Sequence, residues 1–428
     1  MIFYKNKRKR DIMYFGRYEN QNLSKTTAGV PVRETWRRNL TTLWLTQFFA
    51  MVGLSAVVPF LPLFIRELGV QNQQEAVTWS GLVFAAPFFV TIFITPFWGA
   101  VGDKYGMRIM VIRAVIGLGI AQILMAYAQS VEQLFFFRIL QGALSGFYPS
   151  AMTLIASNTP EEKQGYALGA FQSANTSGNI FGPVIGGFLS VIIGFRSVFV
   201  ASAIISFMMA IVLYYTLKEE VRVPPKTPRF KYLDYWKFAL TSRSLMLLLT
   251  LIFLASFGVA FIRPLFVFFI ETMVSDSKTL PGTTGALYSL IGIFSAFSSF
   301  WFGKRIDTHG SRQVLFVGTI LTGTMYIAHF FVTSVYLLIP VRILLGLGYG
   351  VILPALFTGI SHSSPPEKKG GLMGIASSAQ TLGNMLAPLL SGVIASLFSV
   401  RASFIFAGVV FLLMLPFAQM QERIKENQ

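Results

Sequence analysis

The sequence repeats itself once, at an offset of 204 to 205 residues, and this repeat constrains the fold more than any other feature. The segment from Gly99 to Arg108 returns as Gly303 to Arg312 with the same spacing of glycine, aspartate and arginine. Further pairs at this offset are Arg138 and Arg342, Gly142 and Gly346, Pro59 and Pro264, Gly178 and Gly383, Pro183 and Pro388, and Arg196 and Arg401. The chain is therefore a duplicated unit.

Each copy of the unit contains six apolar segments, and ~20 apolar residues suffice to cross a membrane as a helix. Hydrophobic residues make up 54% of the chain and charged residues 12%, whereas a soluble domain is about a quarter charged. An even number of helices per copy gives both copies one orientation, as in transporters built from parallel repeats. We predict an all-α polytopic membrane protein with twelve transmembrane helices at 40–65, 79–101, 109–128, 133–156, 165–190, 197–217, 244–270, 284–303, 313–333, 335–360, 371–397 and 402–419.

The distribution of basic residues predicts the orientation. Most of the 35 Lys and Arg fall in the tails and in the loops after even-numbered helices, so the positive-inside rule places both termini in the cytoplasm. This placement explains the net charge of +17 without a nucleic-acid partner. The absence of cysteine excludes disulfides and thiol chemistry, and we expect neither a metal nor a cofactor. The expected parts are a basic arm (1–39), an N-terminal half (40–217), a cytoplasmic linker (218–243), a C-terminal half (244–419) and a cytoplasmic tail (420–428).

The fifth predicted helix carries Gly178, Gly182 and Gly186 on one face, with Pro183 and Gly187 beside them. Glycines four residues apart leave a groove that admits another helix backbone, and we expect the eighth helix to fill it at Gly182. Such faces are also common as general packing surfaces in membrane helices. The whole decuplet, Gly-Asn-Ile-Phe-Gly-Pro-Val-Ile-Gly-Gly, resembles the fifth-helix signature of drug:proton antiporters of the major facilitator superfamily.

Three further motifs extend this resemblance over nearly all of 40–420. They are the Asp103 loop between helices two and three, Arg138 with Gln141 and Gly142 on helix four, and Gly53 with Pro59 and Pro62 on helix one. The resemblance implies the major facilitator fold and the twelve-helix drug-antiporter branch. It also implies a monomer of the plasma membrane that exports lipophilic small molecules in exchange for protons, by alternating access.

A gate is expected where the second and eighth helices reach the cytoplasm. Its residues are Asp103, Gly106, Arg108, Lys163, Asp307 and Lys368. Gly106 permits the positive φ of a tight turn. A two-fold arrangement of the repeat would let Asp103 face Lys368, or the adjacent Lys369, and would let Asp307 face Lys163. Solvated loop charges that only set the topology are the alternative.

Charged groups inside the apolar segments constrain the mechanism. Arg138, Arg263 and Arg342 lie inside predicted helices, Arg138 and Arg342 a turn or two from the outer ends, and a guanidinium there needs a polar partner or water. The resemblance implies a proton-transfer role for Arg138, whereas Arg342 would bond backbone carbonyls. Arg263 has no counterpart in the first half; it either pairs with Glu271 or Glu67, or binds an anionic group of the substrate. None of the 18 Asp and Glu lies mid-helix, unlike in many cation-exporting relatives, so Glu67 is the expected proton carrier.

Neutral polar side chains inside the spans are expected to line a substrate cavity together with Arg263. They are Gln47, Gln141, Tyr148, Gln172, Asn175, Tyr288, Tyr349, Gln380 and Asn384. Export of many drugs is the first interpretation, and transport of one metabolite, such as a sugar or an organic anion, is the second. A membrane enzyme or receptor is the third, but the sequence shows no Walker loop, His cluster or nucleophile constellation.

Overall fold

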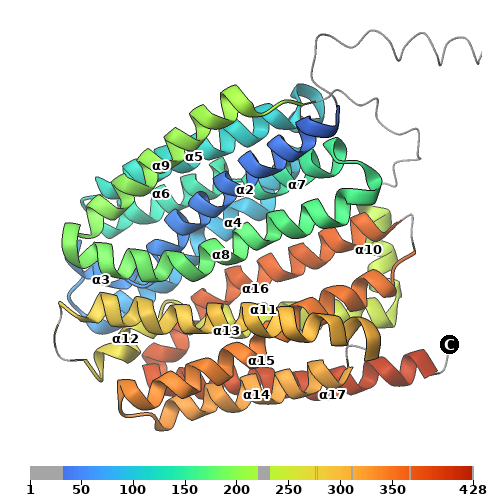
Figure 1. Cartoon of the computed structure of the whole chain (residues 1–428). Coiled ribbons are helices and arrows are strands. Elements are labelled where there is room, and N and C mark those ends of the chain that lie inside the picture. The colour runs from blue at the N-terminus through green and yellow to red at the C-terminus, as the bar shows by residue number, and fades with distance from the viewer. Residues whose placement is uncertain are drawn as a thin grey trace, which may run out of the picture.

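The structure is a computed structural model in which two helical halves lie side by side (Figure 1). It describes residues 32–219, 232–274, 276, 278–309, 312–365 and 368–426. The N-terminal half consists of α2 (Val32–Ala56), α3 (Leu61–Glu67), α4 (Gln73–Tyr105), α5 (Met107–Ala126), α6 (Val131–Leu144), α7 (Phe147–Asn158), α8 (Glu161–Ile193) and α9 (Phe195–Thr216). The C-terminal half consists of α11 (Arg243–Ile262), α12 (Phe266–Glu271), α13 (Leu280–His309), α14 (Arg312–Phe331), α15 (Val335–His362), α16 (Lys369–Leu397) and α17 (Val400–Glu426).

The described helices account for the twelve predicted spans. Nine are long and apolar enough to cross a membrane, and α2 with α3, bent by 51°, forms a tenth span. The two remaining predicted spans correspond to the pair α6 and α7, interrupted at Ser145 and Gly146, and to α16; these helices do not pass the same test of length and apolar character. The fold is therefore all-helical over the described residues, as predicted from the sequence.

Several helix boundaries differ from the prediction. The first and seventh spans are not single helices: α2 ends before Pro59 and α11 ends before Pro264, because proline provides no N–H for the helical ladder. These breaks lie at equivalent positions of the repeat. In addition, α2 begins at Val32 and α17 continues to Glu426, so helix extends into the predicted arm and tail.

Four helices, α4, α8, α13 and α16, form the junction between the halves. Within the N-terminal half α2 packs on α8 and α5 packs on α9, and within the C-terminal half α11 packs on α16 and α14 packs on α17. The two halves meet through α4 against α16 and through α8 against α13. These two junctions are equivalent under the repeat, since each joins the second span of one half to the fifth span of the other.

The two ends of the molecule differ in how closely the halves approach. At the end that carries α3 and α12, here the α3/α12 end, α8 and α16 pack tightly on the opposite half. At the other end, the linker end, an added Cβ on Gly169 of α8 or on Gly374 of α16 would meet no atom within 4 Å. These two glycines are equivalent positions of the repeat. Among the described residues, the close contacts of α8 and α16 with the opposite half therefore lie towards the α3/α12 end, and Gly169 and Gly374 at the linker end are exposed.

A short helix lies in the predicted linker. Helix α10 (Tyr232–Thr241) begins beyond the undescribed residues 220–231 and packs on α16 and α11. The Lys368 ammonium lies 4.2 Å from the centre of the Phe238 ring on α10. A linker with no membrane span was predicted, and at ten residues α10 is too short to be one.

Candidate functional site: the junction between the halves and its polar side chains

Two glycine–proline contacts close the halves at the α3/α12 end. Gly285 of α13 lies so close to α8 that an added Cβ would overlap the carbonyl oxygen of Pro183. In the same way, an added Cβ on Gly81 of α4 would overlap the carbonyl oxygen of Pro388 on α16. Each half thus presents a glycine of its second span to the proline of the other half's fifth span. We call these two contacts the glycine–proline seams.

An ion pair reinforces the closed end. Arg66 at the end of α3 binds Glu271 at the end of α12, and their side chains are 23% and 35% exposed. Positions 66 and 271 differ by 205, so they are equivalent positions of the repeat that meet near the two-fold axis. Beside them, Glu67 lies 3.7 Å from Arg196, which also donates to two backbone carbonyls of the α5–α6 loop. The two acids considered as partners of Arg263 are therefore paired with other arginines.

The glycine face of α8 packs on a different helix from the one expected. Added Cβ atoms on Gly178, Gly182 and Gly186 would collide with α2, at Gly182 with Ser55 Cβ at 2.6 Å and the Val52 carbonyl oxygen at 2.8 Å. The expectation that helix eight fills this groove is wrong. The eighth span, α13, instead meets the adjacent face of α8, where Ser289 donates to the Ile180 carbonyl oxygen at 2.7 Å and where Gly187 lies against Pro281.

Four of the predicted cavity residues in the N-terminal half form two hydrogen-bonded pairs. Gln47 on α2 donates to Asn175 on α8 at 2.9 Å, and the Tyr148 hydroxyl on α7 donates to Gln172 on α8. Gln47 is buried, Asn175 and Tyr148 are half-buried, and Gln172 is exposed. The pairs therefore line one strip of α8, which changes from buried to exposed towards the linker end.

Arg138 and Gln141 form a buried polar pair on α6. The Arg138 guanidinium donates to Gln141 Oε1 at 2.9 Å, yet Arg138 Nε and Gln141 Nε2 are buried and have no hydrogen-bond partner among the described residues. Arg138 is only 7% exposed. An unsatisfied guanidinium nitrogen at this depth is unfavourable unless another group or water reaches it.

Arg342, the repeat equivalent of Arg138, is packed differently. Its Nε donates to the Leu287 carbonyl oxygen on α13 at 3.1 Å, and its guanidinium lies 3.7 Å from the centre of the Phe266 ring. Backbone bonding of this kind was the structural use expected for Arg342. The repeat is thus symmetric in sequence here but asymmetric in contacts.

Arg263 lies in the break between α11 and α12, where its backbone N–H donates to the Ala260 carbonyl oxygen at 3.3 Å. Its side chain makes no hydrogen bond or ion pair with any described residue. The side chain is half-buried. The ring centre of Tyr288 on α13 lies 5.8 Å from the Arg342 guanidinium. Tyr288 and Tyr349 on α15 are both half-buried. Gln380 and Asn384 are half-buried on α16 without a described polar contact.

The predicted gate is described only in part. Gly106 has φ of +96°, the positive value expected, between α4 and α5. Arg108 donates to the Tyr214 carbonyl oxygen, and Glu219 accepts from the backbone N–H groups of Met107 and Arg108 at 2.8 and 2.9 Å. The side chains of Asp103 and Asp307 lie outside the described residues, so their pairing with Lys368 and Lys163 remains a prediction.

Two charged residues with clear structural roles were not singled out from the sequence. Glu219 caps α5, as described above. Arg113 on α5 bridges the interruption between α6 and α7: it donates to the carbonyl oxygens of Leu144 and Ser145 at 3.0 and 3.1 Å and stacks over Trp98. The role of Arg113 could have been anticipated from the sequence, because an arginine in an apolar segment requires polar partners.

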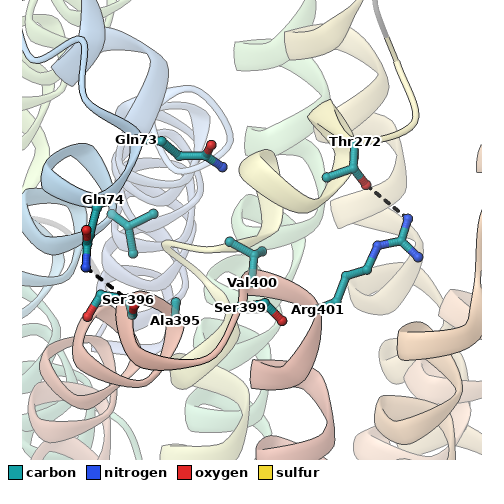
Figure 2. A pocket seen from close by; sticks show the side chains of 9 residues that line it. Gln73, Gln74, Thr272, Ala395, Ser396, Ser399, Val400 and Arg401 are labelled. Atoms are coloured by element: carbon teal, nitrogen blue, oxygen red, sulfur yellow. Dashed lines mark hydrogen bonds between the residues drawn. The ribbon is translucent and has the colours of Figure 1, made fainter.

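A crevice of about 440 Å³ lies apart from these side chains, at the α3/α12 end (Figure 2). It is lined by Gln73, Gln74, Val77, Thr272, Ala395, Ser396, Ser399, Val400 and Arg401. Figure 2 shows Gln74 donating to the Ser396 backbone and Arg401 donating to Thr272. None of the predicted cavity residues lines it, so it lies beside the closed junction and not at the polar cluster.

Known proteins are similar to this chain in sequence and in fold. A family model described as the Major Facilitator Superfamily matches residues 43–304 and 252–423. Multidrug resistance protein MdtG of Salmonella typhimurium is 31% identical over 382 residues, which cover 89% of this chain and 94% of the relative. MdtG of Salmonella arizonae matches equally well, at 31% identity over the same share of each chain.

Solved structures support the fold at lower sequence identity. A bacterial homologue of the human lysosomal transporter Spinster, in an inward-facing and unoccupied conformation, superposes with a TM-score of 0.77 at 16% identity, over 92% of this chain and 98% of that chain. The nucleoside transporter NupG superposes with a TM-score of 0.74 at 11% identity, over 90% and 99% of the two chains. From the family model, the relatives and the two-half architecture together, the chain belongs to the major facilitator superfamily of membrane transporters.

Proposed function

We propose that this transporter exports lipophilic drugs from the cell in exchange for protons, by alternating access. The observation that carries the proposal is the pair of equivalent glycine–proline seams, which join the two halves towards the α3/α12 end. A transporter of this kind must open at each end in turn around a site between two rigid halves. The antiporter-like decuplet on α8 and the similarity to MdtG proteins support drug export as the function.

The proposed orientation follows from the basic loops. With both termini in the cytoplasm of a plasma-membrane protein, the linker end faces the cytoplasm and the α3/α12 end faces outside. The described arrangement is then the one that admits a substrate from the cytoplasm. In the opposite state the seams and the Arg66–Glu271 pair part, and the gate pairs of Asp103 with Lys368 and of Asp307 with Lys163 form.

Proton coupling is assigned to Arg138 and to a carboxylate at the outer end. Glu67 is 47% exposed and lies 3.7 Å from Arg196, so it is open to protons from outside. Arg138 has a buried nitrogen without a described partner and can favour the charged form of a carboxylate that approaches it. The chain works as a monomer in this scheme and needs no cofactor.

Transport of a single metabolite is the second candidate. The absence of a mid-helix carboxylate favours it, because many exporters of cationic drugs rely on one, and the unpaired Arg263 also favours it.

Accumulation of ethidium in everted membrane vesicles tests the first proposal. A pH gradient should drive uptake of the dye, and a protonophore should abolish it. Vesicles without the protein provide the background. Protein-dependent uptake that persists after the gradient is collapsed would refute proton antiport, and the absence of any protein-dependent uptake of several lipophilic dyes would favour the single-metabolite alternative.

A further inference from the structure

The crevice at the α3/α12 end is built from both halves of the molecule (Figure 2). Residues of α4 form one wall, and residues of α16 and α17 form the other together with Thr272. Across the crevice, Gln74 donates to the Ser396 carbonyl oxygen at 3.4 Å. The crevice also borders the junction of α4 and α16, where a Cβ added to Gly392 would lie 3.4 Å from the Val77 carbonyl oxygen. Its shape therefore depends on how closely the two halves approach.

Arg401 is the charged side chain of this crevice, and all the other described residues that line it are neutral. Arg401 is half-buried; its Nη1 donates to the Val332 carbonyl oxygen and its Nη2 donates to the Thr272 hydroxyl, both at 3.2 Å. Its guanidinium lies 5.7 Å from the centre of the Phe269 ring. In the described part of the chain it pairs with no carboxylate. A guanidinium has five N–H groups, so Arg401 retains donors for a further acceptor.

Arg196, the repeat equivalent of Arg401, shows what an arginine at this position binds. Arg196 donates to the Ala128 carbonyl oxygen at 2.8 Å, and this carbonyl is the repeat equivalent of the one that accepts from Arg401. The two arginines are therefore held in the same way. Arg196 Nε also lies 3.7 Å from the carboxylate of Glu67, and the repeat equivalent of Glu67 is Thr272. The arginine thus has a carboxylate beside it in the N-terminal half and a hydroxyl in the C-terminal half.

The crevice lies where that carboxylate is missing. Thr272 lines it, and the Thr272 hydroxyl carries no charge that would compensate the guanidinium. The acids next to the lining residues in the sequence do not replace it. Glu271 is paired with Arg66, and Glu75 is exposed on α4 and does not line the crevice. An arginine without a counter-ion at an open crevice favours an anionic ligand from outside the chain.

The size and the polar lining of the crevice indicate the kind of anion. Its volume of about 440 Å³ falls within the range of ~300–1,000 Å³ that is usual for small-molecule sites, so the ligand carries more than a lone ion. Gln73 and Ser399 add an amide and a hydroxyl to the lining, and Figure 2 shows Gln73 and Arg401 on opposite sides of the crevice. A phosphate ester offers more acceptor oxygens than a carboxylate and can therefore accept from both walls. The planar fork of arginine matches phosphate oxygens.

We propose that this crevice binds the phosphate group of a phosphate ester, with Arg401 as the counter-ion, in the place that Glu67 takes beside Arg196. The ester is either free in the solution outside the cell or part of the headgroup of an anionic phospholipid. Because the ligand contacts both halves, it stabilises the arrangement in which the α3/α12 end is closed. This last consequence rests on the proposed alternating access, whereas the site itself does not.

Isothermal titration calorimetry of the purified protein with glycerol 3-phosphate tests the site for a free ester. The wild-type protein should bind it, and Arg401→Gln should weaken binding about tenfold or more, the loss expected of one charge-assisted hydrogen bond. Thr272→Glu should weaken binding by a similar factor, because the new carboxylate gives Arg401 the partner that Glu67 gives Arg196. Thr272→Gln adds the same bulk without the charge and should weaken binding far less.

Lipid nanodiscs test the site for a headgroup. Native mass spectrometry of protein released from phosphatidylglycerol nanodiscs should show an additional retained lipid on the wild-type protein compared with Arg401→Gln or Thr272→Glu. Nanodiscs of phosphatidylcholine, whose headgroup has no net charge, should show no such difference. Arg243→Gln removes an exposed arginine at the start of α11 and should match the wild-type protein in both experiments. If Arg401→Gln does not fold, the comparison of Thr272→Glu with Thr272→Gln still decides the question.

The outcomes separate the site from the transport function. Binding of glycerol 3-phosphate that the variants lose supports a free ester, and a difference in retained phosphatidylglycerol alone supports a headgroup. No difference between the wild-type protein and the variants in either experiment would overturn the site, whatever the vesicles transport. Gly285→Ala separates the halves at the other seam, away from the crevice, and should also weaken binding. Unchanged binding in Gly285→Ala would overturn the link to alternating access and leave the site standing, and failure of ethidium uptake would refute export alone.

Discussion

The glycine–proline seams predict that one methyl group can shift the transporter between its two states. In Gly285→Ala, the new Cβ would overlap the Pro183 carbonyl oxygen and would lie 3.1 Å from its carbonyl carbon and 3.3 Å from Gly187 Cα. All three atoms belong to the backbone of the opposite half, so no side chain can move aside. The halves must separate at this end, whereas the packing inside each half is unchanged.

The size of the shift follows from the overlap. Overpacking of this kind costs ~1–3 kcal/mol, and in this protein the strain is present only when the α3/α12 end is closed. A free-energy difference of that size changes the ratio of two states by roughly 5- to 150-fold. We therefore expect Gly285→Ala to favour the state that is open at the α3/α12 end.

Spin labels can measure this population, because the chain has no native cysteine. Cysteines at Ile192 on α8 and Leu397 on α16, which are 75% and 71% exposed at the α3/α12 end, report the distance between the halves. Double electron–electron resonance should show a larger share of long distances in Gly285→Ala. Gly374→Ala is the matched control, since its Cβ meets no atom within 4 Å, and it should not increase that share. Unchanged distances in a folded Gly285→Ala protein would refute the role of the seams.

Three further predictions follow from contacts described above. Gly182→Ala should lower the melting temperature without changing the distance distribution, because its clash at ~1–3 kcal/mol lies inside one half; a shift in the distances instead would contradict this. Charge reversal of Arg66 or of Glu271 alone should weaken closure of the α3/α12 end by ~1 kcal/mol or less, and the double exchange Arg66→Glu with Glu271→Arg should restore the wild-type distances; failure to restore them would show that the pair is not the cause. Arg138→Ala should abolish pH-driven efflux while dye binding survives, and Arg138→Lys should restore only part of it because lysine lacks the fork of donors; uphill pumping by Arg138→Ala would remove this residue from proton coupling.

The architecture could be predicted from the sequence because the repeat and the apolar segments both act at the scale of whole helices. The breaks at Pro59 and Pro264 were visible as prolines, but whether a proline bends a helix or interrupts it depends on the neighbours that satisfy the backbone. The spacing of Gly178, Gly182 and Gly186 correctly indicated a close helix contact and could not identify the partner. The sequence of one helix determines which residues form its small-residue face, but the helix that packs on this face also depends on the sequences of the other helices.

The charged residues show the same limit. Glu271 was considered as a partner of Arg263. In the structure it pairs with Arg66 instead, because the two-fold axis brings these equivalent positions together. Glu219 was not considered at all, since its two backbone partners lie 112 and 111 residues away in the sequence. Such contacts appear only when the helices are assembled in three dimensions.

The ion pair of Arg66 with Glu271 also favours the association of unlike halves. A position on the two-fold axis of two identical copies meets its own duplicate, so an arginine would face an arginine and a glutamate would face a glutamate. Such pairing of like charges is repulsive, and only one N-terminal half with one C-terminal half converts it into an attraction. Two N-terminal halves, or two C-terminal halves, would lack this attraction at the equivalent position.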